Sequence, residues 1–164
     1  MSSRLRRLTP ALALLSAVCI AAAMPTTASA RHGRDMRGAV RRPAVDRGER
    51  AAVIALSEVG VPYVWGGESP SGFDCSGLVR FAYAQVGVSL PHSSYALYDT
   101  GRAVSRTKLR PGDILFFSGL GHVGIYVGKG RMVHAPQTGE DVEVVSLASG
   151  YGASFVAARR VIPG

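Results

Sequence analysis

Cys75 lies where a loop rich in glycine, proline and serine gives way to a segment with helical periodicity, in the sequence Phe73-Asp-Cys-Ser-Gly-Leu. A cysteine reacts as its thiolate, and the unpaired N–H groups at a helix N-terminus favour that charged form. Two histidines further along the chain, His122 and His134, are able to supply a base and a second ring that orients it. These residue types point to the nucleophilic thiol chemistry of a cysteine hydrolase.

The chemistry expected of such a set is the cleavage of an amide in two steps. The Cys75 thiolate attacks the amide carbon, while His122 acts first as base and then as acid toward the leaving amine. Hydrolysis of the resulting thioester completes the cycle. The backbone N–H of Cys75 is a natural donor to the oxyanion, and the Tyr63 hydroxyl is a second candidate.

The two histidines are expected on one β-hairpin, whose turn is Gly128-Lys129-Gly130. A three-residue turn places Val127 opposite Arg131, and this register puts His134 opposite Gly124 with His122 on the diagonal. Side chains alternate between the faces of a strand, so both histidines then share one face and Gly124 leaves room between them. A two-residue turn would put the two rings on opposite faces and remove the basis for this pairing.

Several other interpretations of these residues remain open at this point. A lone cysteine is often an inert buried side chain, and single histidines on strands are often surface or core residues. A second interpretation is a zinc site formed by Cys75, His122 and His134 with a water, although no short ligand pair of the Cys-x-x-Cys kind supports a metal site. Tyr63 and Trp65 are potential core aromatics, and His92 has no partner visible in the sequence.

The order of the predicted elements indicates an α+β fold. Helical spacing of apolar residues predicts helices over residues 48–59 and 75–86 and a shorter one from Ser93 or Ser94 to Gly101. Residues 61–72 are expected to be an extended loop. Short β-branched and aromatic segments follow, predicting strands over residues 113–117, 122–127, 131–135, 142–146 and 155–161. Helices followed by strands predict helices packed on an antiparallel sheet of about five strands.

The basic charge of the chain lies almost entirely in its first fifty residues. The formal net charge is +8, and residues 1–50 account for all but one unit of it. Residues 51–164 are therefore nearly neutral, so nothing in their charge resembles a nucleic-acid-binding face. Residues 31–46 are predicted to be a basic, disordered leader that acts as a solubilising tether or contacts anionic cell-surface polymers.

The first thirty residues have the pattern of an export signal. Three arginines precede an apolar run, and Ala28-Ser-Ala30 has the small-x-small form of a cleavage site. Pro10 and Ser16 interrupt the run, which is too short for stable membrane insertion. Cleavage after Ala30 would remove Cys19 and leave Cys75 as the single cysteine, so no internal disulfide could form. The remaining chain is long enough for one domain.

Five segments of the chain, in this order, resemble the NlpC-type family of cell-wall cysteine endopeptidases: Pro62-Tyr-Val-Trp-Gly-Gly, Phe73-Asp-Cys-Ser-Gly-Leu-Val, Arg110-Pro-Gly-Asp-Ile-Leu-Phe-Phe, Gly121-His-Val-Gly-Ile-Tyr-Val-Gly and Met132-Val-His-Ala-Pro. The resemblance covers about residues 47–162. It implies a compact papain-like fold and the hydrolysis of peptidoglycan stem peptides, typically between D-isoglutamate and the diamino acid, with a thiol and no metal or other cofactor.

The resemblance also assigns roles by position. Cys75 corresponds to the nucleophile, His122 to the base and His134 to the third polar residue. Tyr63 falls at a family tyrosine beside the nucleophile, while Asp74 and Ser76 flank it as candidate substrate contacts.

The chain is thus expected to comprise a signal peptide (1–30), the leader (31–46) and a peptidase domain (47–164), acting as a monomer outside the cell or on its wall. The competing functions are an amidase cutting the sugar–peptide junction or a peptide cross-link, an acyltransferase on the same scaffold, and a non-catalytic wall-binding module.

Overall fold

The structure, a computed structural model, describes residues 46–161. The predicted signal peptide and nearly all of the predicted leader lie outside these described residues. No helix within residues 46–161 is long and apolar enough to cross a membrane.

Helices occupy the first part of the described chain, as the sequence predicts. They are α1 (Arg47–Ser57), α2 (Cys75–Ala84) and α3 (Ser94–Tyr98). Each begins at a polar residue whose side chain accepts a backbone N–H of the first turn: Asp46, Asp74 and Ser93. The predicted helices are confirmed, with ends shorter than the apolar periodicity indicated.

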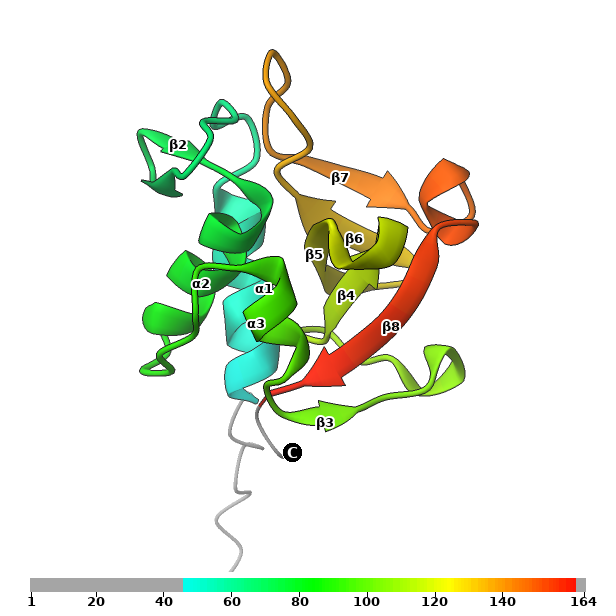
Figure 1. The fold of residues 1–164 in the computed structure, drawn as a ribbon. Helices are drawn as coiled ribbons and strands as arrows, with labels where there is room; N and C mark the ends of the chain where they lie inside the picture. Colours follow the sequence, from blue (N-terminus) through cyan, green and yellow to red (C-terminus); the bar gives the residue numbers. More distant parts are fainter. Residues whose placement is uncertain (1–45, 162–164) are drawn as a thin grey trace, which may run out of the picture. The chain divides into compact units, whose positions relative to one another are not determined.

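Strands fill the rest of the fold and form one antiparallel sheet of six. They are β3 (Arg102–Ala103), β4 (Ile114–Phe117), β5 (His122–Gly128), β6 (Arg131–His134), β7 (Glu143–Ser146) and β8 (Phe155–Arg160), arranged in the order β3-β8-β4-β5-β6-β7. The five predicted strands are confirmed, and the two-residue β3 adds a sixth at the edge. Figure 1 shows the helices gathered on one side of this sheet.

The loop before α2 contains a small hairpin that the sequence did not predict. It pairs β1 (Glu68–Ser69) with β2 (Gly72–Phe73). Single turns of 3₁₀-helix complete the connections, at η1 (Arg106–Lys108), η2 (Ser118–Leu120) and η3 (Gly150–Gly152).

Each face of the sheet packs on its own apolar cluster. On the helix side, small residues of α1 and the apolar stripe of α2 meet one set of strand residues, which includes Val123, Ile125 and Val133. On the opposite side Leu115, Phe117, Met132, Leu147 and Ala158 form a second cluster. Residues of β5 and β6 therefore alternate between two buried environments, which specifies the pairing of these strands strongly.

The hairpin of β5 and β6 reaches the predicted register by a different route. Gly128 pairs with Arg131 across a two-residue turn, in which Lys129 and Gly130 have φ of 53° and 67°. This turn type suits two left-handed residues. The predicted three-residue turn is therefore wrong.

A β-bulge at Val127 corrects the register. It lets Tyr126 pair with Met132 and Ile125 with Val133, which continues to Gly124 opposite His134. One extra residue on β5 restores the facing that the short turn alone would have changed. The predicted common face of the histidines is confirmed.

A buried ion pair ties the start of β4 to the end of β8. Arg160 donates from Nε and Nη2 to the two carboxylate oxygens of Asp113, both at 2.6 Å, and Asp113 is 1% exposed. The backbone N–H of Arg110 and the carbonyl of Lys108 complete the network. Such paired geometry is what allows two charges to be buried.

We predict that Arg160→Met lowers the free energy of unfolding by about 3 kcal/mol, because it leaves the Asp113 carboxylate buried without its cation. Urea unfolding followed by circular dichroism measures this difference. Arg110→Met is the matched control, because that side chain is exposed and only its backbone contacts Asp113. Equal losses in the two variants would show that the buried pair has no special role.

Candidate active site

Cys75 is the first residue of α2, and Asp74 fixes that position. The Asp74 carboxylate accepts the backbone N–H of Gly77 at 2.6 Å and the Ser76 hydroxyl at 3.0 Å. It thereby caps the helix and leaves the N–H groups of Cys75 and Ser76 at the open end. The thiol is partly buried and lies against the helix-side core.

Burial raises the pKa of the Cys75 thiol above its ordinary value. Hydrogen bonding from the backbone N–H groups of Val123, Ser76 and Cys75 acts in the opposite direction, while the negative charge of Asp74 raises the pKa further. The contact with Val123 places the sulfur at the beginning of β5, one residue from His122. The free thiol is thus neutral at pH 7, and the three backbone N–H groups are the ones that would stabilise its anion.

The two histidines of the hairpin contact each other directly. His122 Nε2 lies 2.9 Å from His134 Nδ1, and their rings meet edge to face. A Cβ at position 124 would lie 3.2 Å from His134 Cβ and 2.9 Å from Met132 Sδ. Gly124 therefore leaves the space that this close approach needs, as the sequence predicts.

Aromatic side chains surround this histidine pair. The Tyr151 ring packs against both imidazoles, and Phe117 lies against His122. His134 is fully buried. Burial lowers the pKa of His122 to about 4 and, together with the neighbouring His122, lowers that of His134 to about 3. Both rings are therefore neutral near pH 7, the state in which an imidazole can act as a base.

The hydrogen bond between the rings leaves Nδ1 of His122 as the nitrogen available to the thiol. Within residues 46–161 no hydrogen bond joins that nitrogen to the Cys75 sulfur. Catalytic hydrogen bonds are often long in free enzymes and tighten when substrate binds. The structure therefore brings Cys75, His122 and His134 into one region, while their catalytic roles stay predictions.

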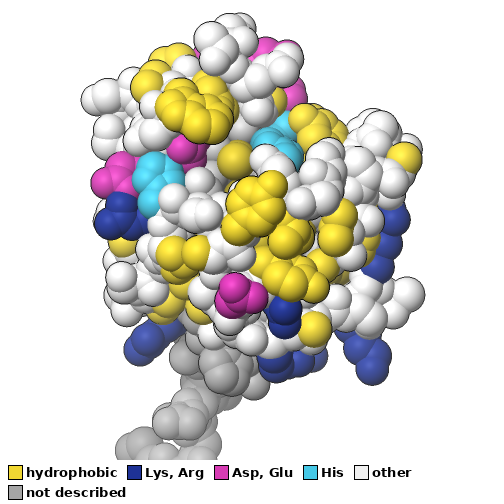
Figure 2. Space-filling view, in the orientation of Figure 1, with side chains coloured by type: hydrophobic (Ala, Val, Ile, Leu, Met, Phe, Trp, Pro, Cys, Tyr) yellow, Lys and Arg dark blue, Asp and Glu magenta, His cyan; other side chains and the backbone are white. Residues whose placement is uncertain are grey.

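A cleft of about 410 Å³ opens over the thiol. Its lining comes from the loop before α2, from α2 itself and from the segment before α3: Tyr63, Trp65, Asp74, Cys75, Ser76, His92, Ser93, Ser94, Tyr95 and Gly121. Trp65 is 86% exposed at its rim and Tyr95 is 62% exposed. Figure 2 shows histidine side chains at two places on this face, with hydrophobic side chains between and around them. The interpretation of Trp65 as a core aromatic is wrong.

Tyr63 lies partly buried near Cys75. Its hydroxyl has a raised pKa because of burial and the nearby Cys75 and Asp74. It lines the cleft with the thiol, so a contact with the oxyanion or the substrate stays a prediction for it.

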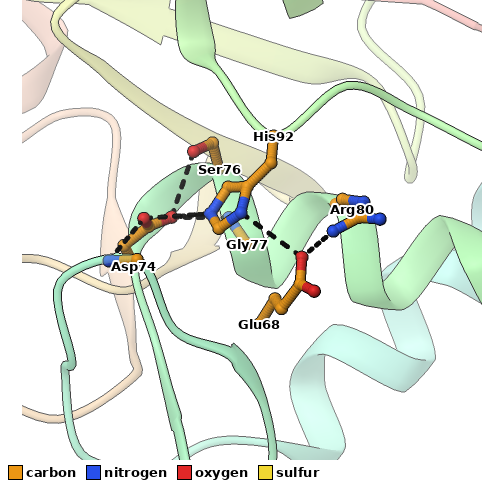
Figure 3. Close-up of polar contacts among 7 residues, drawn as sticks. Glu68, Asp74, Ser76, Gly77, Arg80 and His92 are labelled. Atoms are coloured by element: carbon orange, nitrogen blue, oxygen red, sulfur yellow. Dashed lines mark hydrogen bonds and ion pairs between the residues drawn. The ribbon is translucent and has the colours of Figure 1, made fainter.

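His92 is a functional candidate that sequence reasoning left without a partner. Its Nε2 lies 2.9 Å from one Asp74 oxygen and 3.0 Å from the other, and its Nδ1 lies 3.3 Å from Glu68. Figure 3 shows His92 between these two carboxylates, with Arg80 on the far side of Glu68. The partners are distant in sequence, so no local pattern could have revealed them.

The contacts of Asp74 bear on its predicted role in substrate binding. Burial by itself would raise its pKa, but hydrogen bonds from Gly77, His92 and Ser76 outweigh burial and lower it. The N–H of Gly66 adds a further bond at 3.0 Å. The carboxylate is therefore occupied within the protein and holds the loop against α2. Direct contact of Asp74 or Ser76 with substrate stays a prediction.

The zinc alternative would need three suitable side chains in one place. In the part of the chain that the structure describes, no three His, Cys, Asp or Glu side chains form a group able to hold a metal ion. The arrangement that is present is a pair of mutually bonded imidazoles and a thiol that contacts the backbone of Val123, the residue after His122.

Comparisons with known proteins show which proteins this chain resembles. Residues 60–160 match the model of the NlpC/P60 family. A probable endopeptidase of Mycobacterium tuberculosis is 52% identical over 105 residues, which are 62% of this chain and 27% of the relative. The murein DD-endopeptidase MepH of Escherichia coli is 40% identical over 128 residues, which are 70% of this chain and 47% of the relative. The chain thus spans about a quarter of the first relative and half of the second.

A solved structure extends the likeness to the fold. The NlpC/p60 domain of the peptidoglycan hydrolase SagA superposes with a TM-score of 0.63 and 38% identity, over 69% of this chain and 97% of that domain. The α+β, papain-like fold expected from the sequence is thereby confirmed.

We predict that alkylation of Cys75 by iodoacetamide accelerates about tenfold per pH unit between pH 6 and 8. A raised thiol pKa means that the thiolate fraction still increases over this whole range. Mass spectrometry of the Cys75 peptide measures the rate, with glutathione as the reference thiol. A rate that stays flat from pH 5 to 8 would instead show a thiolate already formed beside a charged imidazole.

Proposed function

The chain belongs to the NlpC/P60 family, and from that membership we propose that it is a cysteine endopeptidase that hydrolyses the stem peptides of peptidoglycan. The observation that carries the proposal is the placement of Cys75 at the open end of α2, beside the start of β5, where the bonded pair of His122 and His134 lies. The names of the relatives, which include a murein endopeptidase, supply the substrate class.

The proposed mechanism begins with transfer of the thiol proton to Nδ1 of His122. The Cys75 thiolate attacks the amide carbon, and the tetrahedral oxyanion accepts hydrogen bonds from the free N–H groups at the start of α2. The protonated His122 then gives its proton to the leaving amine. Water, activated by the same ring, hydrolyses the thioester and regenerates the thiol. His134 keeps the His122 ring in the required orientation throughout.

The bond that we propose is the one between D-isoglutamate and the diamino acid. The likeness to a murein DD-endopeptidase favours a second candidate, the D,D-amide of a peptide cross-link. The two differ in their products, because the first shortens stem peptides and the second separates cross-linked muropeptides. An amidase would release intact peptides from the sugar, and an acyltransferase would join them to an added amine.

The place of action that fits this substrate is outside the cytoplasmic membrane. The predicted export signal of residues 1–30 agrees with such a location. In the same proposal the basic leader of residues 31–46 holds the protein on anionic wall polymers, through contacts that salt should weaken.

We predict that Cys75→Ala abolishes hydrolysis of purified peptidoglycan, since no other described side chain can form the thioester. Mass spectrometry of the released muropeptides identifies the bond cut by the unaltered protein. Val53→Ala, which changes an exposed side chain of α1 outside the cleft, is the control and should retain activity. Activity in the Cys75 variant would remove the thiol from the mechanism, and loss of activity with a chelator would favour the zinc alternative. Binding to wall without any turnover would indicate a non-catalytic module.

We predict that Trp65→Ala raises KM for muropeptides about fivefold with little change in kcat, because an aromatic side chain this exposed at the rim of the cleft contributes binding area rather than chemistry. Steady-state kinetics on a soluble muropeptide measure both constants. Val53→Ala removes an exposed apolar side chain of α1 outside the cleft and should leave KM unchanged. An unchanged KM in the Trp65 variant would exclude this rim from substrate binding.

A further inference from the structure

The buried ring of His134 has one nitrogen whose partner is not accounted for. Nδ1 faces His122, but Nε2 has no hydrogen-bond partner among the described residues. The side chain is fully buried, so bulk water is not available to this nitrogen. Buried polar atoms in native proteins are almost always hydrogen-bonded, and an exception calls for a physical explanation.

The neighbouring strand brings a carboxylate to this nitrogen. His134 and Glu143 are directly opposite each other in the pairing of β6 with β7, so their side chains lie on the same face. Glu143 Oε1 is 3.4 Å from His134 Nε2, in a geometry that does not yet meet that of a hydrogen bond. The Glu143 side chain is 50% exposed, so packing does not enclose it on every side. The proposed bond requires a rotation of its side-chain torsions that aligns the carboxylate with Nε2–H.

The protonation states of the two rings demand an acceptor at this place. If Nδ1 of His122 is to take a proton from the thiol, the hydrogen of the neutral ring must be on Nε2 and be donated to His134 Nδ1. His134 must then carry its own hydrogen on Nε2. That hydrogen points toward Glu143. The opposite pair of tautomers would leave His122 with its hydrogen on Nδ1 and unable to act as a base.

Few other ionisable groups surround the pair. His122 faces His134 from β5, Glu143 faces it from β7, and the Tyr151 ring covers it from η3. Glu140, in the loop between β6 and β7, acts on Tyr151 through its charge, but its carboxylate accepts a hydrogen bond from Gln137 at 3.0 Å. Glu143 is therefore the group placed to accept from His134.

We infer that Glu143 is a positioning residue of this site: its carboxylate accepts the Nε2–H of His134 and so fixes the tautomers of both histidines in the form in which His122 can deprotonate Cys75. Its effect on catalysis rests on the function proposed above, whereas its effect on the rings does not. Glu143 does not touch the reacting atoms. It acts through His134 on His122.

Nuclear magnetic resonance of ¹⁵N-histidine-labelled protein tests the hydrogen bond without substrate. In the unaltered protein we expect His134 to have a protonated Nε2 and an unprotonated Nδ1. In Glu143→Ala the Nε2–H should exchange with water about tenfold faster, and the nitrogen shifts should move toward a mixture of tautomers. Glu143→Gln keeps an acceptor oxygen and should give an intermediate result. Glu140→Ala removes a nearby carboxylate that does not face His134 and should match the unaltered protein.

Steady-state kinetics on muropeptides provide the second readout. Glu143→Ala should lower kcat about tenfold with KM unchanged, because the base is less often in the required tautomer. Glu143→Gln should recover most of that loss. Circular dichroism and thermal unfolding show whether each variant is folded, and the glutamine variant serves if the alanine variant is not.

These measurements distinguish a failure of the inference about Glu143 from a failure of the proposed function. Unchanged exchange and tautomer populations in the folded Glu143 variants would overturn the inference, even if the protein hydrolyses peptidoglycan. Altered tautomers in a protein that never hydrolyses peptidoglycan would uphold the positioning role and overturn the proposed function. If Glu140→Ala lowers kcat as much as Glu143→Ala does, the fall reflects a general effect of negative charge. That result would also overturn the inference about Glu143.

Discussion

The register between β5 and β6 is the constraint on which the whole site depends. Side chains alternate along a strand, so the two imidazoles meet only if Gly124 faces His134. Both faces of the sheet are buried, and a slip by one residue would drive Val123, Ile125 and Val133 into the wrong cluster and the histidines with them. The apolar pattern of the hairpin thus specifies the site as firmly as it specifies the core.

Burial then gives this geometry its chemical character. The pair of rings is covered by Tyr151 and Phe117, and the same desolvation that keeps both histidines neutral also raises the pKa of the thiol. The thiol and the two imidazoles are therefore neutral in the free protein. Neutral groups cost less free energy to bury than an ion pair would. In the proposed mechanism, charge develops only when substrate is bound, and the backbone N–H groups at the start of α2 then stabilise the oxyanion.

The loop before α2 is held against the start of this helix, which fixes the position of the Cys75 thiol. The Asp74 carboxylate accepts hydrogen bonds from Gly77 and Ser76 of α2 and from Gly66 of the loop. It also contacts the His92 ring. His92 in turn reaches Glu68, so the β1–β2 hairpin, the start of α2 and the segment before α3 are joined around one carboxylate. The rim of the cleft, including the exposed Trp65, is held by this network.

Local and periodic features could be predicted from the sequence, and contacts between distant segments could not. The helices and the five longer strands follow from apolar spacing, and the shared face of His122 and His134 follows from the alternation of side chains along the two strands. The predicted three-residue turn was wrong. A two-residue turn of left-handed residues, combined with a bulge, gives the same register. Trp65 was ambiguous because its motif carries no information on burial, and the partners of His92 and His134 come from segments that only the fold brings together.

The bulge at Val127 has a consequence for changes of chain length in this hairpin. With every residue kept, loss of the bulge alone would pair His134 with Ile125 and rotate its side chain toward the helix-side core. Deletion of Val127 would remove the bulge and the extra residue together, so Tyr126 would stay opposite Met132 and the two imidazoles would keep their common face.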